Sequence, residues 1–548
     1  MPIEDHTCGS SGETGVSVEQ LITEHLAIWT AADTEKKSGR GRSSGNAGSV
    51  YGIKKLRELI YELAATGKLV DHNNDESNQY LLGEVSEFIM GQAPLGSECN
   101  TNGDGVIFVK TGEFGLVFPE VKEWTTKPLK FAKKGDVLIC VVGATIGKLN
   151  LSIDCAIGRS VAAIRPTDII ETKYLYIALT PFTLRLRERQ RGSAQGVIGK
   201  AELSSIKIRV PSITEQRLIV AKVDELMALC DQLENQHNNA AKAHEKLVIH
   251  LFGTLTQSQN AEDFNTQWQR ISEHFDTLFT SEASIDALKQ TLLQLAVMGK
   301  LVPQDPNDEP ASELLKRIQT EKAKLITDGK IKKDKPLAAI AEEEKPFDLP
   351  EGWEWVRKNE VFAFLNGYAF KSEWFESSGI KLLRNVNVSH GKATWSDPAY
   401  ISIEQAANFN EYMLNVDDLV LSLDRPIITT GLKYAIISKA DIPCLLLQRI
   451  AKVSSFCKVV NSEYLAIWLN SSFFVGNIDP GRSNGVPHIS TTQVANMCFA
   501  LPPTAEQWRI VAKVDELMAI CDKLKSHLTA ANQLQQKIAN VLIVQTVN

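Results

Sequence analysis

The sequence contains the same helix-forming stretch twice. EQRLIVAKVDELMALCDQLE (215–234) and EQWRIVAKVDELMAICDKLK (506–525) are identical at 15 of 20 positions, at an offset of 291 (506 − 215). A second pair, IKKLRELIYELAATGKLV (53–70) and IDALKQTLLQLAVMGKLV (285–302), recurs at an offset of 232 (285 − 53). A repeat of this kind constrains the architecture before any local pattern is read. We name the 53–70 type helix A and the 215–234 type helix B, so the order is A, insert, B, and then A, insert, B again.

The two inserts separate the repeated helices. Insert 1 runs from about 71 to 212 and insert 2 from about 303 to 503, and the two offsets differ by 59 (291 − 232), so insert 2 is longer by that amount. The inserts show little obvious sequence resemblance to each other. We therefore expect the two sets of repeated helices to share one function and the two inserts to have different functions.

Both copies of helix B carry a heptad-like apolar seam, with spacings that alternate between four and three. Such a seam is suited to pairing with another helix, either helix A or the other helix B. The simpler alternative is an amphipathic helix packed on its own domain. The seam residues are Ile219, Val223, Leu226, Cys230 and Leu233 in the first copy and Ile510, Val514, Leu517, Cys521 and Leu524 in the second. Gly67 and Gly299 are expected to end the two A helices in a left-handed turn.

Both inserts are predicted to be mixed α/β, because short β-branched runs bounded by turns alternate with helical patterns. The candidate strands are VIFVK (106–110), DVLICVV (136–142), SVAAIRP (160–166), DLVLSL (418–423) and RIAKVSS (449–455).

Composition sets limits on the class of protein. At 548 residues the chain is too long for one core. The N-terminus lacks the cationic and apolar pattern of a secretory signal, and no 18-residue apolar run predicts a membrane span. The nine cysteines are scattered without CxxC or zinc spacing, which favours a reducing, cytoplasmic setting.

The charge distribution neither requires nor excludes nucleic acid as a partner. The net charge is −7, yet residues 81–210 hold 17 Lys/Arg against 13 Asp/Glu (+4), and residues 351–501 hold 13 against 14 (−1). Phosphate contacts need Lys and Arg, so DNA binding would use local patches or a partner's help.

Catalytic motifs are not found in the sequence. GATIGK (143–148) has three residues between its glycines instead of four and lacks the following Ser or Thr of a phosphate loop, and His244, Glu245 and His250 have the wrong order for a zincin helix. No Gly-rich cofactor loop pairs with the Asn-Pro-Pro-aromatic motif of an adenine methyltransferase. We interpret the chain as non-catalytic.

The sequence resembles the specificity subunits of type I restriction–modification systems, in the subfamily with an N-terminal extension (IB-like). The resemblance covers nearly everything after residue 18. It is carried by the two A and two B helices and by GKLVPQDPNDEPASELLKRI (299–318), LPEGWEWV (349–356), GSAQGVIGKAELSSIKIRVPS (192–212) and GRSNGVPHISTTQVANMCFALPP (481–503). The first half departs from this pattern, because DHNNDESNQYLLGEVSEF (71–88) replaces the PQDPNDEPASELL and LPEGWEWV elements.

The resemblance implies an α+β fold with an internal pseudo-twofold repeat. Two mixed α/β target-recognition domains would be separated and followed by long helices that form an antiparallel two-helix, coiled-coil spacer. The implied segments are an N-terminal extension with a short helix and flexible linker (1–50), the first repeat helix (51–71), target-recognition domain 1 (80–212), the central repeat helices and linker (213–345), target-recognition domain 2 (346–503) and the C-terminal repeat helix (504–548).

The same resemblance implies the partners. Each recognition domain would read half of a split, asymmetric site in double-stranded DNA. The helices would dock two methyltransferase (M) subunits, and restriction (R) subunits would join for cleavage, with no membrane involved. This chain would bind no cofactor, because S-adenosylmethionine, ATP and magnesium belong to the partner subunits.

Candidate DNA-contacting residues follow from the chemistry of base and phosphate recognition, since Arg and Lys suit guanine and phosphate whereas Asn and Gln suit adenine. A solvated helix face is the simpler alternative for the arginine-rich stretch RLRERQR (185–191). The candidates are Lys110, Thr111, Arg159, Arg187, Arg191, Ser193, Gln195 and Lys200 in insert 1, and Tyr368, Lys371, Arg384, Asn385, Asn387, Arg425, Arg482, Ser483, Asn484 and His488 in insert 2.

Two other classes of function are also compatible with the sequence. The chain could be a non-enzymatic helical-repeat scaffold whose inserts bind other proteins, or a self-contained nuclease or methyltransferase. A methyltransferase complex without sequence preference would favour the scaffold, and catalysis by the chain alone would favour the enzyme.

Overall fold

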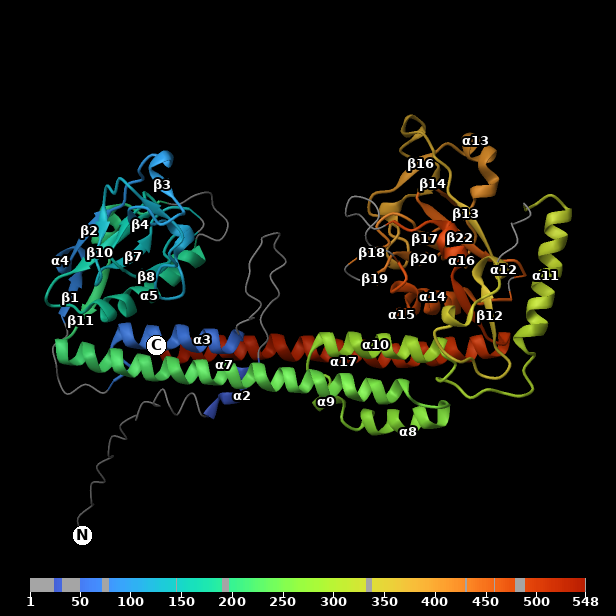
Figure 1. The fold of residues 1–548 in the computed structure, drawn as a ribbon, viewed down its shortest axis with the longest axis horizontal. Coiled ribbons are helices and arrows are strands. Elements are labelled where there is room, and N and C mark those ends of the chain that lie inside the picture. Colours follow the sequence, from blue (N-terminus) through green and yellow to red (C-terminus); the bar gives the residue numbers. More distant parts are fainter. Residues whose placement is uncertain are drawn as a thin grey trace, which may run out of the picture. The chain divides into compact units, whose positions relative to one another are not determined.

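The structure is a computed structural model that describes residues 24–31, 50–70, 78–143, 145–189, 197–331, 338–428, 431–457, 459–478 and 488–547. The chain forms two compact units (Figure 1). Unit 1 comprises residues 1–241 and 530–548, and unit 2 comprises residues 242–529.

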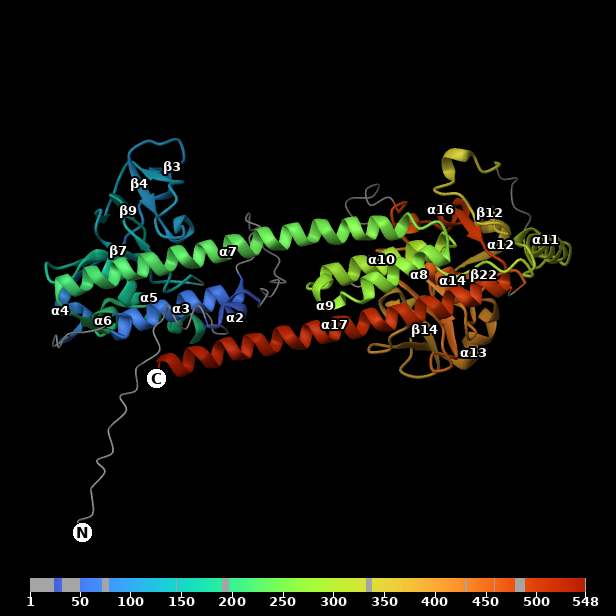
Figure 2. The ribbon, with the colours of Figure 1, turned by 90° about the horizontal axis from the view of Figure 1, so that it is seen from below.

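In unit 1, helix A and helix B of the first repeat pack against each other. Helix A is α3 (Tyr51–Thr66), and helix B is the 213–241 part of α7 (Ile213–Thr256). Leu56, Ile60 and Leu63 of α3 share one core with Ile219 and Cys230 of α7. The two helices run side by side in both views (Figures 1 and 2). The predicted seam therefore pairs with helix A of its own repeat.

Two further helical pieces contact this pair. The 530–547 part of α17 (Thr504–Val547) adds Ala539 to the core of unit 1, and Asn540 Oδ1 accepts a hydrogen bond from the Tyr51 hydroxyl over 3.0 Å. The short helix α2 (Leu26–Ala31) buries Trp29 against α3. The rest of the predicted N-terminal extension lies outside the described residues.

The described residues of insert 1 form three sheets and three α-helices. The sheets have the orders β1-β11, β2-β10-β7-β8 and β3-β5-β4-β9-β6. The strands are β1 (Asn78–Leu81), β2 (Ser86–Met90), β3 (Cys99–Asn100), β4 (Val106–Val109), β5 (Trp124–Thr125), β6 (Phe131–Ala132), β7 (Val137–Cys140), β8 (Leu149–Leu151), β9 (Cys155–Ile157), β10 (Val161–Pro166) and β11 (Lys207–Val210). The helices are α4 (Leu82–Val85), α5 (Thr172–Arg189) and α6 (Lys200–Ser204).

Unit 2 repeats the helical arrangement. Helix A is α10 (Glu282–Val297), which shares a core with Ile510, Val514, Leu517 and Cys521 of α17. Val248, Phe252 and Leu255 of α7 join this core, as does Phe264 of α8 (Ala261–Ser272) (Figure 2). Two further helices before the first strand of insert 2 are α9 (Phe275–Leu278) and α11 (Ala311–Thr327).

Insert 2 is also a mixed α/β domain. Its sheets have the orders β12-β23, β13-β22-β17-β20-β15, β16-β14-β21 and β18-β19. The strands are β12 (Glu354–Arg357), β13 (Phe362–Asn366), β14 (Ile380–Leu383), β15 (His390–Gly391), β16 (Ala399–Ile401), β17 (Leu419–Ser422), β18 (Ile427–Ile428), β19 (Gly431–Leu432), β20 (Tyr434–Ile436), β21 (Cys444–Leu446), β22 (Ile450–Ser455) and β23 (Cys498–Leu501). The helices are α12 (Lys358–Val361), α13 (Ile403–Ala406), α14 (Ser462–Asn470), α15 (Ser472–Val475) and α16 (Thr491–Asn496).

The two inserts share a core of strand pairings, which their sequences did not reveal. The antiparallel pairs β1–β11, β2–β10, β10–β7 and β7–β8 correspond to β12–β23, β13–β22, β22–β17 and β17–β20. The parallel pair β4–β9 corresponds to β14–β21. Even a close approach recurs, because a side chain at Gly91 or Gly367 would clash with the backbone oxygens of Gly158 or Leu447. The helices and the inserts are therefore both duplicated.

This correspondence also bears on the part of insert 1 that departs from the family pattern. The run β1, α4, β2 starts at residues 78, 82 and 86, and the run β12, α12, β13 starts at residues 354, 358 and 362. The offset is 276 in all three cases (354 − 78, 358 − 82, 362 − 86). The compressed stretch of insert 1 thus still forms the entry strand that pairs with the exit strand β11.

Candidate nucleic-acid interface

Each insert is fastened to its helix B by a buried glutamine. In unit 1, Gln216 Nε2 donates to the carbonyl oxygens of Ile169 (2.8 Å) and Pro211 (2.9 Å), and Gln216 Oε1 accepts from the Glu171 N–H (2.8 Å). In unit 2, Gln507 Nε2 donates to Pro502 O (3.1 Å) and Gln507 Oε1 accepts from the Asn461 N–H (2.8 Å). Both side chains are fully buried. This lock fixes the start of helix B to the start of α5 or α14 within each unit.

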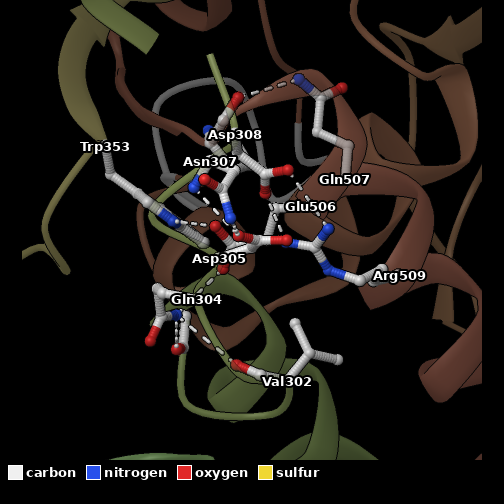
Figure 3. Close-up of polar contacts among 11 residues, drawn as sticks. Val302, Gln304, Asp305, Asn307, Asp308, Trp353, Glu506, Gln507 and Arg509 are labelled. Carbon is white, nitrogen blue, oxygen red and sulfur yellow. Dashed lines mark hydrogen bonds and ion pairs between the residues drawn. The ribbon is translucent and has the colours of Figure 1, made fainter. Parts of the chain in front are cut away.

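The neighbouring glutamate is also duplicated, but its partners differ. In unit 2, Glu506 is buried, with Trp353 Nε1 donating to Oε2 and Gln304 Nε2 donating to Oε1, each over 2.9 Å (Figure 3). Burial raises the pKa of Glu506, while these two hydrogen bonds oppose that shift. In unit 1, the equivalent Glu215 forms an ion pair with Arg209 over 2.6 Å. Hydrogen bonds from two uncharged donors in unit 2 thus take the place of the ion pair in unit 1.

In insert 2, four chain segments meet at one end of the central sheet, where β17 ends and β22 begins. Asn385 follows β14, and its side chain donates to Asp424 O (3.0 Å) and accepts from Ser422 Oγ (2.6 Å) and Lys433 Nζ (3.1 Å). The Leu423 N–H donates to Arg449 O (2.9 Å) and the Ile489 N–H donates to Leu423 O (3.0 Å). The structure thereby brings the predicted candidates Asn385, Arg425 and His488 together.

Asp424 is the acidic centre of this cluster. Its Oδ2 accepts from Arg449 Nη1 over 2.9 Å, and its Oδ1 lies 3.1 Å from His488 Nδ1. The Asp424 side chain is only 13% exposed, whereas that of Arg449 is 66% exposed. A largely shielded carboxylate therefore holds two exposed nitrogen-bearing side chains at the surface.

Two residues of this cluster have a left-handed backbone conformation without being glycine. Arg425 has φ = 51° and Arg449 has φ = 69°. This region is uncommon for residues with a Cβ and costs about 1 kcal/mol or more each. Both arginines are exposed. Strained backbone at exposed arginines on adjacent loops is typical of a functional surface.

Insert 1 presents the equivalent end of its sheet with different side chains. Lys110 follows β4 as Arg384 follows β14, and Lys110 passes over Gly158 in the β9–β10 turn that also holds the exposed Arg159. Lys110 Nζ forms an ion pair with Glu123. The exposed Arg187 of α5 passes beside Gly147 in the β7–β8 loop. Lys110, its neighbour Thr111 and Arg159 thus lie after strands at this end of the sheet, and Arg187 of α5 lies beside one of its loops. The exposed Lys200, in contrast, begins α6.

Several predicted contacts are occupied within the protein. Asn387 is buried, with Oδ1 accepting from the Arg384 N–H (3.2 Å) and Nδ2 donating to Thr394 O (2.9 Å), so it holds its loop and is not presented to DNA. Arg384 forms an ion pair with Asp397 over 2.8 Å. The Tyr368 ring packs against Phe370 and Phe409 with centroids 5.0 and 4.6 Å away.

Two further groups of candidates complete the set. Lys371 is exposed and its ammonium lies 5.7 Å from the centroid of the Trp374 ring. Six candidates lie outside the described residues: Arg191, Ser193, Gln195, Arg482, Ser483 and Asn484. The pair Asp424 and Arg449, in contrast, was not predicted at all. Arg449 could have been found as the counterpart of the β9–β10 turn, had the shared topology been visible.

Five of the described cysteines are buried as free thiols. Burial raises the pKa of Cys140, Cys155, Cys230 and Cys521 to about 11 and that of Cys444 to about 12, which keeps these thiols protonated. In the described part of the chain, no group of three or more His, Cys, Asp or Glu side chains is placed to hold a metal ion. Among the same residues, no helix has the length and apolar character needed to cross a bilayer.

Comparison with known proteins relates the whole chain to one family. The family model described as "Type I restriction modification DNA specificity domain" matches residues 74–243 and 350–534. The chain is 46% identical to the type I restriction enzyme EcoAI specificity subunit of Escherichia coli and 33% identical to the EcoEI specificity subunit of the same species; each match covers 97% of this chain and 100% of the relative. A crystal structure of the HsdS subunit from Thermoanaerobacter tengcongensis is 32% identical over 33% of this chain and 46% of that chain, with a TM-score of 0.29.

Proposed function

This chain belongs to the family of type I restriction enzyme specificity subunits, and we propose that each of its two inserts reads one half of a split, asymmetric DNA site. Membership rests on the family model that matches both inserts and on full-length relatives. It favours the specificity subunit over a protein-binding scaffold. The observation that carries the two-half reading is the shared topology of the inserts, because it places two equivalent reading surfaces on one chain.

The two half-sites are expected to differ in sequence. At equivalent loop positions insert 1 has Lys110, Thr111 and Val142, and insert 2 has Arg384, Asn385 and Asp424. The equivalence of Val142 and Asp424 is supported by their isolated bridges to Val197 and His488. Since hydrogen-bonding and apolar side chains select different base edges, unlike side chains on like scaffolds favour an asymmetric target.

We further propose that α7 and α17 form an antiparallel coiled-coil spacer. Each helix has 44 residues and therefore a length of about 66 Å at 1.5 Å per residue. That length exceeds one turn of B-DNA, about 34–36 Å. Helix B would then set the number of unread base pairs between the half-sites. The boundaries of the recognition domains at 80–212 and 346–503 remain predictions.

The same helices would dock two M subunits. In unit 1, Leu534, Ile538, Val541 and Val544 of α17 form an apolar stripe in which the side chains are between 37% and 59% exposed. In unit 2, Leu247 of α7 is 50% exposed at the position equivalent to Ile538 (247 + 291 = 538). An exposed apolar stripe on a helix is typical of a protein interface. The equivalence of Leu247 and Ile538 favours two copies of one partner, one on each unit.

The remaining assignments follow from this role. The chain itself would be non-catalytic and would bind no cofactor; S-adenosylmethionine would be bound by the M subunits, and ATP and magnesium by R subunits that join for cleavage. We assign the complex to the cytoplasm, where its DNA is found and where buried thiols such as Cys230 and Cys521 stay reduced.

The decisive experiment maps adenine methylation across the genome of cells with and without this chain. We expect a two-part motif that disappears when the chain is deleted. Replacing residues 90–205 with the same segment of another specificity subunit should change one half of the motif and leave the other half intact. Methylation that persists without the chain would contradict the proposal, and a swap that changes both halves would contradict the assignment of the inserts.

A further inference from the structure

We propose that Arg449 reads a guanine in the half-site recognised by insert 2, and that Asp424 is the positioning residue that orients its guanidinium. This inference rests on the proposed function and adds to it one specificity-determining residue and the class of base pair that it selects. A guanidinium is the side-chain group best suited to guanine, because two of its N–H donors match the O6 and N7 acceptors in the major groove.

The geometry of the pair fits this role. Asp424 Oδ2 accepts from Arg449 Nη1 over 2.9 Å, and the Arg449 side chain remains 66% exposed. A guanidinium has five N–H donors, so one bond to Asp424 leaves donors for a bidentate contact with a base. The carboxylate limits the rotamers of a long, exposed side chain, and this reduces the entropy lost when the base contact forms.

Asp424 is itself held in place from several directions. Its carbonyl oxygen accepts from Ser422 Oγ (2.8 Å) and Asn385 Nδ2 (3.0 Å), and its second carboxylate oxygen lies 3.1 Å from His488 Nδ1. The backbone of Arg449 is fixed as well, because its carbonyl oxygen accepts from the Leu423 N–H over 2.9 Å. Carboxylate and guanidinium are therefore anchored on two adjacent loops of one sheet.

Charge distinguishes this pair from a phosphate contact. A carboxylate beside the DNA backbone would repel the phosphates, and pairing with Asp424 cancels most of the long-range attraction of Arg449. A neutralised arginine contributes little to general affinity for DNA. The contact with Asp424 instead fixes the orientation of the guanidinium, and recognition of a base edge depends on that orientation.

The left-handed backbone of Arg449 supports the same conclusion. With φ = 69°, Arg449 adopts a conformation that glycine or asparagine would adopt with less strain. Arg425, next to Asp424, has φ = 51°. Strain at both positions is consistent with a requirement for arginine at the surface that outweighs backbone preference.

Insert 1 has other residues at the two equivalent positions. Val142 corresponds to Asp424 and Ser160 corresponds to Arg449, because the Val141 N–H donates to Ser160 O as the Leu423 N–H donates to Arg449 O. The oriented arginine thus belongs to insert 2. It gives a physical reason for that half-site to contain a G·C pair that insert 1 does not select by the same means.

The test uses the complex of the full chain with its M subunit, and its target mapped by sequencing methylated DNA. Methyl-transfer rates are measured on a panel of duplexes in which each base pair of the insert 2 half-site is changed in turn. Arg449→Lys keeps the charge but loses the two parallel N–H donors of the guanidinium. We expect it to abolish discrimination of about 10- to 100-fold at one G·C pair only. Asp424→Asn should reduce the discrimination at the same G·C pair. It should also strengthen binding to unrelated DNA, because one negative charge is removed.

Asp417→Asn is the matched control. Asp417 is exposed, also has a positive φ (68°), and lies before β17 whereas Asp424 lies after it. Its substitution should leave the whole panel unchanged. Full discrimination by both Arg449→Lys and Asp424→Asn, or an equal loss at every pair, would overturn the inference while leaving the proposed function intact. Equal methyl-transfer rates of the unmodified complex on every duplex of the panel would contradict both the proposed function and this inference.

Discussion

Trp353 donates its indole N–H to the buried carboxylate of Glu506 over 2.9 Å, which joins the entry of insert 2 to the first turn of α17 (Figure 3). Gln304 donates to the other carboxylate oxygen over 2.9 Å. Beside them, Arg509 forms an ion pair with Asp308. A single glutamate on helix B thus receives one donor from each of two chain segments that lie far from it in the sequence.

Trp353→Phe should destabilise unit 2 by about 1–3 kcal/mol, because Glu506 would keep its burial and lose a donor. The change is measured by urea unfolding of the purified chain. Trp508→Phe is the control, since Trp508 lies on the same helix but is 60% exposed, and it should shift the unfolding free energy by less than about 0.5 kcal/mol. Equal effects of the two substitutions would show that the hydrogen bond contributes nothing measurable.

Lys358 predicts a pH dependence of stability. It is fully buried in α12, donates to Cys498 O over 2.9 Å, and its ammonium lies 5.5 Å from the centroid of the Trp468 ring and 5.4 Å from that of the Phe474 ring. Burial lowers its pKa to about 7 from an ordinary value of 10.5. Between these values the unfolded chain binds the proton and the folded chain does not, so the unfolding free energy should rise with pH, by up to about 1.4 kcal/mol per pH unit.

Lys358→Met should remove this slope, and thermal unfolding measured between pH 7 and pH 10 tests it. The unmodified protein should be stabilised as the pH rises through this window, relative to the variant. A variant whose slope matches that of the unmodified chain would mean that Lys358 is solvated in the native state. Lys371→Met, at an exposed lysine, controls for the loss of one charge.

Arg159 should act on phosphates and not on base sequence. It is exposed in the β9–β10 turn of insert 1. In Arg159→Ala, DNA affinity of the complex with its M subunit should fall by a similar factor for cognate and unrelated duplexes. The slope of log K against log salt should fall by about 0.9, as expected when one phosphate contact is lost. Fluorescence anisotropy over a range of salt concentrations measures both quantities.

The control for Arg159 is Arg185→Ala. Arg185 lies on α5, but Nη1 donates to both carboxylate oxygens of Glu62 in α3 over 2.8 and 2.9 Å. Its substitution should leave the salt slope unchanged. A loss of preference for the cognate duplex in Arg159→Ala would instead identify Arg159 as a base reader.

The exposed apolar positions on the long helices should determine how many M subunits bind. Ile538→Lys in α17 should remove one M subunit from the complex, and Leu247→Lys in α7 should remove the other, because each places a charge in an apolar interface. Native mass spectrometry should then report one M subunit with each single variant and none with the double variant. Gln533→Lys, at an exposed polar position of α17, should leave both bound.

The helical part of the fold was predictable because its signal is local. The heptad spacing singled out Ile219, Val223, Leu226 and Cys230, and all four are buried against α3. Gly67 and Gly299 have the expected positive φ, at 81° and 69°. Strands β4, β7, β10, β17 and β22 also lie within the predicted runs, since buried β-branched segments bounded by turns are recognisable without tertiary information.

The common topology of the inserts could not be predicted from self-comparison. The offset between equivalent strands drifts from 274 for β4 and β14 (380 − 106) to 291 for β11 and β23 (498 − 207). Loops of different length therefore move the equivalent strands out of any single alignment register. Sheet cores tolerate many apolar exchanges, so little identity remains to reveal the match.

Residue type alone predicted the candidate site only in part. Asn387 fits the pattern of an amide in a loop, but its side chain caps the turn after β14 and bonds to Thr394 O. Arg425 and His488 do lie at one surface with Asn385. Arg449 and Asp424 are 25 positions apart, and no local pattern indicates that one orients the other. A pair of residues that only the tertiary fold brings together can be identified only once the fold is known.

Unit 1 takes its residues from both sides of unit 2 in the sequence, since 530–547 of α17 seal the core of α3 and α7 with Ala539. A ribosome therefore delivers all of unit 2 before the last pieces of unit 1. During that interval the core formed by α3 and α7 lacks the contact with Ala539. Translation order therefore makes the core of unit 1 the last part of the chain to receive all of its residues, after the whole of unit 2 has been synthesised.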